Sequence, residues 1–139
     1  TVNYGQLTDL STIVTQNAFV THLQGLTATP SIAAGTGAGT GPTVAMGTGS
    51  TDLSGIVNVT TGTTPAGTNA NVVTITFATA YTKPTFVQLT PNNSLTALLT
   101  GVTMVYTTDS TTTFIIKSGT TALTGATAYS WKYSVLGGK

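Results

Sequence analysis

The sequence predicts a mainly β protein, an antiparallel β-sandwich or jelly-roll-like head that follows a short N-terminal helical segment. Three observations lead to this fold class. From about residue 53 onward, apolar residues alternate with a period of two, as in strands with one buried face. Short runs rich in glycine, proline, asparagine and aspartate separate the alternating runs. Threonine supplies roughly a quarter of the chain, and its β-branched side chain fits a pleated, half-hydrated surface.

Residues 6–26 have a different pattern, because their apolar residues recur mostly three or four positions apart. This spacing is typical of one face of a helix. A candidate a/d-like seam with one polar position consists of Leu10, Ile13, Asn17 and Val20. The seam would join the copies of an oligomer, or the helix would simply pack on its own domain. The spacing leaves both interpretations open.

The following segment predicts the domain organisation. Residues 35–50 are rich in glycine and threonine, which is typical of a linker or wide turns. We therefore expect residues 1–41 to form a helical anchor or stalk with a glycine-rich linker, and residues 42–139 to form the sandwich head. The glycine-rich run lacks the lysine of a phosphate-binding loop and the strand and helix that flank a dinucleotide-binding loop.

Five strands of the head are predicted from their alternation. They are expected at 72–77, 85–89, 102–106, 114–117 and 129–135. Seven or so short strands separated by turns indicate a sandwich. Residues 94–99 are compatible with a strand or a short helical turn, and we favour a loop with one helical turn. In the last strand, Tyr129, Trp131 and Tyr133 share one face, which is expected to be the core or, alternatively, a platform for stacking sugars.

Charged residues are scarce, since the chain has four lysines, three aspartates and no arginine or glutamate. Only 5% of the residues are charged, against roughly a quarter in an ordinary soluble domain. Four scattered lysines do not make a nucleic-acid-binding stripe or an anchor for an anionic membrane. No apolar run reaches the roughly 18 residues of a membrane-spanning helix. Membership in a large assembly would explain how so uncharged a chain stays in solution.

The sequence does not predict an enzyme. Its titratable inventory is one histidine, His22, and few charged residues, and no nucleophile motif accompanies them. Asp52 and Asp109 lie in turns rich in serine and threonine, where aspartate commonly bonds nearby backbone. Neither is accompanied by enough carboxylates for a metal site. Cysteine is absent, which excludes disulfides and thiolate metal sites. We expect no cofactor.

The stretch from Gly37 to Leu136 resembles a domain found at the ends of bacteriophage fibre and spike proteins. The matching pieces are 39–44, 55–65, 73–81, 87–92, 116–123 and 129–133. They contain structural residues and no catalytic motif. The resemblance implies a β-sandwich head that forms a homotrimer around the fibre axis on the outer surface of a phage particle.

Several functions follow as expectations. A fibre head would help attachment to the host surface through polar loops that touch a glycan or receptor, and the candidate contacts are Asn92, Asn93, Asp109 and Trp131. A capsid decoration or head fibre would have a purely structural role and would bind other virion proteins through its N-terminal segment. A third alternative is a carbohydrate-binding module. We expect neither nucleic acid nor membrane insertion among the interactions.

Overall fold

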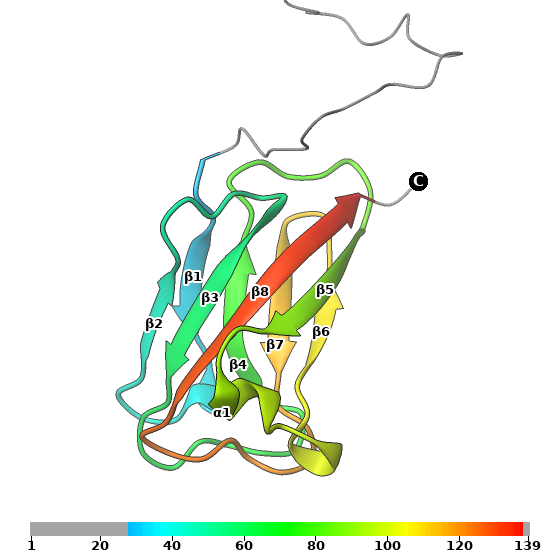
Figure 1. The fold of residues 1–139 in the computed structure, drawn as a ribbon. Helices are drawn as coiled ribbons and strands as arrows, with labels where there is room; N and C mark the ends of the chain where they lie inside the picture. The colour runs from blue at the N-terminus through cyan, green and yellow to red at the C-terminus, as the bar shows by residue number, and fades with distance from the viewer. Residues whose placement is uncertain (1–27, 138–139) are drawn as a thin grey trace, which may run out of the picture.

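The computed structural model describes residues 28–137, which form two antiparallel four-stranded sheets packed face to face (Figure 1). One sheet has the order β1 (Ser31–Ala34), β4 (Asn71–Thr76), β7 (Thr113–Lys117) and β6 (Tyr106–Asp109). The other has the order β2 (Thr43–Met46), β3 (Ser54–Thr60), β8 (Ala128–Gly137) and β5 (Thr85–Pro91). The predicted antiparallel sandwich is confirmed. The predicted helix of residues 6–26, with its seam, lies outside the described residues.

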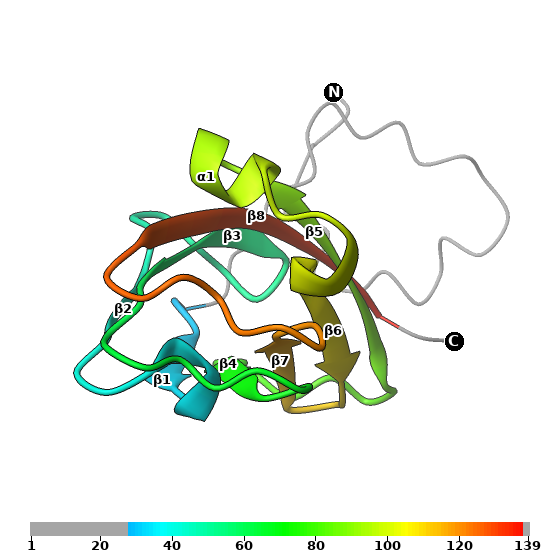
Figure 2. The ribbon, with the colours of Figure 1, turned by 90° about the horizontal axis from the view of Figure 1, so that it is seen from below.

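The two sheets form two layers, as the end-on view in Figure 2 shows. The core forms where the alternating apolar faces of the two sheets meet. On β8, Trp131 and Tyr133 are buried while Lys132 between them is exposed, as a period of two requires. Aromatic rings join the layers, because Phe114 of β7 lies 5.2 Å from the ring of Tyr133. The interpretation of the β8 aromatic row as core is therefore confirmed.

The prediction of a glycine-rich linker is wrong, because residues 31–46 belong to the sandwich. Strand β1 pairs with β4, and β2 pairs with β3. Between β1 and β2, the short 3-10 helix η1 (Thr36–Ala38) places Ala38 in the core, where it is fully buried. Gly39 has a φ of +86°, which favours glycine. Gly62 approaches so closely that an added Cβ would lie 1.9 Å from the Thr40 carbonyl oxygen. These glycines allow close backbone packing instead of a loose connection.

The segment between β5 and β6 also differs from expectation. The predicted helical turn is confirmed as α1 (Ser94–Ala97). The predicted strand over 102–106 is wrong, because residues 101–103 form the 3-10 helix η2 (Gly101–Thr103) and β6 starts at Tyr106. The side chains and backbones of Thr100 and Thr103 cap this turn reciprocally. Local hydroxyl bonding thus outweighs the alternation of apolar residues, as it does in many threonine-rich turns.

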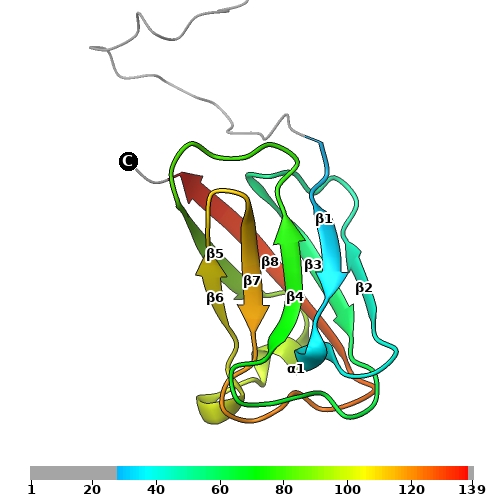
Figure 3. The same cartoon turned by 180° about the vertical axis from the view of Figure 1, so that it is seen from behind.

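The sandwich has two distinct ends and two distinct lateral sides. The start of β1 and the end of β8 lie at one end, whereas α1 and η1 lie at the opposite end (Figures 1 and 3). Strands β5 and β6 are the outermost strands of their sheets on one lateral side, and β1 and β2 on the other (Figure 3). The segment between β5 and β6 carries most of the exposed large apolar residues of the sandwich.

Candidate interaction surface

Large apolar side chains are exposed in the segment that joins α1 to β6. Within residues 28–137 the exposed large apolar residues are Phe86, Leu95, Leu98, Val102, Met104, Tyr106 and Leu136. Five of them occur between α1 and the first residue of β6. The other two, Phe86 and Leu136, are cross-strand partners on the outer face of β5 and β8. We call the five residues between α1 and β6 the apolar edge. Scattered exposed apolar residues are ordinary, but a set gathered in one segment indicates an interaction surface.

Two adjoining hollows lie on the side of β5 and β6, each of about 260 Å³. The first is lined by Thr96 and by apolar Leu89, Pro91, Leu99, Met104, Val105 and Trp131. The second is lined by Val87, Gln88, Leu89, Val105, Tyr106 and Thr107. Both hollows are lined by Leu89 and Val105, so they adjoin between β5 and residues 104–107, and we call the two hollows together the edge groove.

Above the edge groove, side-chain hydrogen bonds join β5 to β6. These two strands belong to different sheets and are not paired by a backbone hydrogen-bond ladder. The Asp109 carboxylate accepts a hydrogen bond from the Val87 N–H at 3.1 Å, and the Thr107 hydroxyl donates to the Val87 carbonyl at 3.4 Å. The backbone of Val87 therefore points away from β8. Since this direction alternates along a strand, the N–H and C=O of Leu89 point into the groove. Pro91, next on this side, has no N–H to expose, as suits an edge strand.

The residues that carry the apolar edge are held in place by hydrogen bonds. Asn93 caps α1, because its side-chain oxygen accepts from the Thr96 N–H at 2.8 Å, and its amide group donates to the Ala128 carbonyl at 3.1 Å. The buried Thr96 hydroxyl accepts from the Ser130 N–H at 2.8 Å. The Val102 carbonyl accepts from the Thr121 N–H at 3.1 Å. These hydrogen bonds thus fix the segment that carries the exposed apolar side chains.

The candidate contact residues do not gather in one place. Asn92 and Asn93 follow the end of β5, whereas Asp109 bonds Val87 near its start. Both functional groups of the Asn93 side chain are used within the chain. Trp131 is only 2% exposed, so it is not an open platform for stacking sugars. Trp131 instead lines the edge groove. The sequence did not predict this groove, because residues 102–106 beside it were assigned to a strand.

A polar row crosses the outer face of β3, β8 and β5. The Asn92 amide group donates to the Ser130 hydroxyl at 3.0 Å, and that hydroxyl donates to the Asn58 side-chain oxygen at 2.8 Å. The exposed side chain of Lys132 lies on the same face and lines a shallow hollow with Ser54 and Ile56. This part of the face therefore presents amides, hydroxyls and one cation, whereas exposed Phe86 and Leu136 lie further along the same face.

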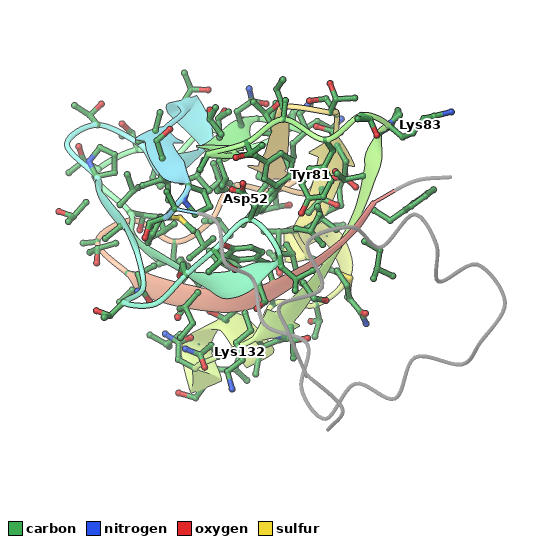
Figure 4. All side chains as sticks on the ribbon, turned by 90° about the horizontal axis from the view of Figure 1, so that it is seen from above. Asp52, Tyr81, Lys83 and Lys132 are labelled. Carbon is green, nitrogen blue, oxygen red and sulfur yellow. The ribbon has the colours of Figure 1, made fainter. Side chains whose placement is uncertain are left out.

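Asp52 is a buried carboxylate that joins two loops. Its two carboxylate oxygens accept from the N–H groups of Ala78 and Thr79 at 2.7 and 2.9 Å. The Tyr81 hydroxyl donates to the Asp52 carbonyl at 3.1 Å. These two bonds reach a loop more than twenty residues further along the chain, beyond the turn in which the sequence places Asp52. Figure 4 shows Asp52 and Tyr81 inside, whereas Lys83 and Lys132 point outward.

The buried tyrosine beside this carboxylate resists ionisation. Burial, and then the negative charge of Asp52, raise the pKa of Tyr133 well above its ordinary value. The same two causes, in the same order, raise the pKa of Tyr81. The Tyr133 hydroxyl donates to the Thr51 carbonyl. A tyrosine held neutral and bonded to backbone supports the fold and is not poised as a proton donor at neutral pH.

No group of three or more histidine, cysteine, aspartate or glutamate residues is placed to bind a metal ion within residues 28–137. Within the same range, no helix is long and apolar enough to cross a membrane. Comparisons with family models, curated proteins and solved structures found no match.

Proposed function

We propose that this chain is the end domain of a bacteriophage fibre or spike, assembled as a homotrimer on the outer surface of the virion. The observation that carries the proposal is the apolar edge. Five large apolar side chains exposed in the one segment between α1 and β6 of an otherwise hydroxyl-rich domain would be a liability for a monomer. Symmetric association covers such a surface, and the outermost strands β5 and β6 as well.

The arrangement of the ends supports a domain mounted by one end. Strand β1 starts and β8 stops at the same end of the sandwich, and α1 lies at the other (Figure 1). A stalk attached on the side of residue 28 would therefore leave the opposite end free. Three copies standing side by side around a fibre axis would bring their β5–β6 sides together.

The polar outer face of β3, β8 and β5 is the surface we propose for contact with the host. It carries Asn58, Asn92 and Lys132, which suit a hydroxyl-rich or anionic ligand bound weakly at each copy. Three copies in a trimer, and many trimers on a particle, would raise the overall avidity. Binding of the labelled protein to bacterial cells should fall with Lys132→Ala and not with Lys83→Ala. Equal binding by both variants would remove this face from the proposal.

Mass in solution tests the proposed assembly. Light scattering of the full chain over a range of concentrations should give three times the 14.0 kDa of one chain. A single-chain mass at every concentration would contradict a trimeric fibre domain. A role as a monomeric carbohydrate-binding module would then become the better explanation.

A further inference from the structure

Exposed apolar side chains lie close to the edge groove in the segment between α1 and β6. We infer that the edge groove of one copy receives Leu98 and Val102 from the rim of a second copy of this chain. Leu98 is 73% exposed and Val102 is 60% exposed, so both are available as projecting side chains. The first hollow of the groove, at about 260 Å³, exceeds the cavity of about 150 Å³ that accommodates a benzene molecule. It is large enough for one or two aliphatic side chains.

The absence of charge in the groove favours a second copy over a charged partner. None of the residues that line the two hollows is ionisable at neutral pH. The nearest carboxylate, Asp109, bonds the Val87 N–H at the upper end. A foreign partner recognised by electrostatic complementarity would find no charge to match. A second copy supplies apolar side chains of the required size from the same surface.

The size of the apolar edge is consistent with a stable interface. Its five side chains are 41–73% exposed and present on the order of 100 Å² each. Together they therefore present roughly 500 Å². A standard interface has roughly 800 Å² per partner, of which somewhat more than half, about 450 Å², is apolar. The edge thus supplies about the apolar area that one partner of such an interface needs.

The symmetry of the proposed trimer fits this contact. Projection and groove lie on the same lateral side, so an axis running beside β5 and β6 would bring the same residues of three copies together. Each copy would insert its rim into one neighbour and receive the rim of the other, which closes after three copies. This inference rests on the proposed function, because it names the surface through which the proposed trimer assembles.

Cysteine crosslinking tests the contact directly, because the chain has no cysteine of its own. A tagged Leu98→Cys chain is co-expressed with an untagged Met104→Cys chain, since Met104 lines the groove and is still exposed. A short bis-maleimide should join tagged to untagged chains. The matched control replaces Met104→Cys with Ala45→Cys, which is exposed on β2 at the opposite side. We expect at least about tenfold more mixed product from the first pair.

Light scattering of the same samples separates the two possible failures. A trimeric mass with no more crosslinking than the Ala45→Cys control would overturn this inference and leave the trimer in place. A single-chain mass for both samples and for the unmodified chain would overturn both proposals. A trimeric mass with the expected mixed product supports both. Circular dichroism of each variant establishes that the chains compared are folded.

Discussion

Among the individual residues, Asp52 connects two separate parts of the chain. The residue is 3% exposed, and its carboxylate accepts two backbone hydrogen bonds from the loop that follows β4. Such bonds satisfy the charge locally, and they also satisfy two N–H groups of that loop. Asp52 therefore fixes the loop that carries Phe77 and Tyr81, whose rings pack 4.9 Å apart.

Replacing Asp52 by asparagine tests this role. Asp52→Asn keeps one acceptor oxygen but turns an NH₂ group toward a backbone N–H. We expect a loss of about 2 kcal/mol in the free energy of unfolding. Urea denaturation measures it, with Asp109→Asn as the matched control on an exposed residue, for which a change within about 0.5 kcal/mol is expected. Equal effects of the two substitutions would show that burial of Asp52 does not matter to stability.

Tyr133 predicts how stability depends on alkaline pH. Its pKa is raised in the folded protein, so the folded state holds the phenol proton more tightly than the unfolded state, where the pKa is about 10. This contribution to stability is complete below pH 10 and is lost as the pH rises from 10 toward the folded pKa. Thermal unfolding should therefore shift to lower temperature above pH 10.

A Tyr133→Phe variant provides the control for this pH dependence. The variant is less stable at neutral pH, because the hydrogen bond to the Thr51 carbonyl is lost. Its unfolding temperature should nevertheless fall less steeply between pH 9 and pH 11 than that of the unmodified chain. Parallel curves for the two proteins would remove Tyr133 as the cause.

At the scale of elements, alternation predicted four of the eight strands within residues 28–137 and failed where local hydrogen bonds compete with it. Strands β4, β5, β7 and β8 fall close to their predicted positions because each has one buried face. The region before β6 has the same alternation at Val102 and Met104, but hydroxyl capping by Thr100 and Thr103 turns the chain instead. The edge groove could not be foreseen, because it depends on which residues sit beside Trp131 after folding.

Strands β1 and β2 were missed because a glycine-rich composition suggested a linker. Composition does not reveal that Ala38 is buried or that Gly62 packs against Thr40. A strand of four residues also has too few positions to display alternation. What the sequence offered was only the short apolar run around Val44, which does become β2.

Shortening the chain tests the corrected domain boundary. A chain that begins at Ala28 keeps β1 and should unfold cooperatively, with the near-ultraviolet circular dichroism of the full chain. A chain that begins at Pro42 lacks β1 and Ala38, which exposes one side of β4 and opens the core. We expect it to be aggregated or unfolded. A Pro42 chain as stable as the Ala28 chain would restore the linker interpretation.

At the scale of the whole molecule, the chain combines few charges with one strongly apolar side. Residues 28–137 contain two aspartates, and both accept backbone hydrogen bonds. Hydroxyl groups and amides keep the remaining faces hydrated. This division is expected of a subunit whose apolar side is covered by its neighbours and whose polar faces meet water.

Charge placed on the apolar edge tests the central claim most directly. Light scattering would compare the unmodified chain with a Leu98→Asp, Val102→Asp double variant and with an Ala45→Asp, Thr76→Asp control, whose two sites are exposed away from that edge. The account predicts a three-chain mass for the unmodified chain and the control, and a single-chain mass for the apolar-edge variant. A trimer that survives in the folded apolar-edge variant would contradict it.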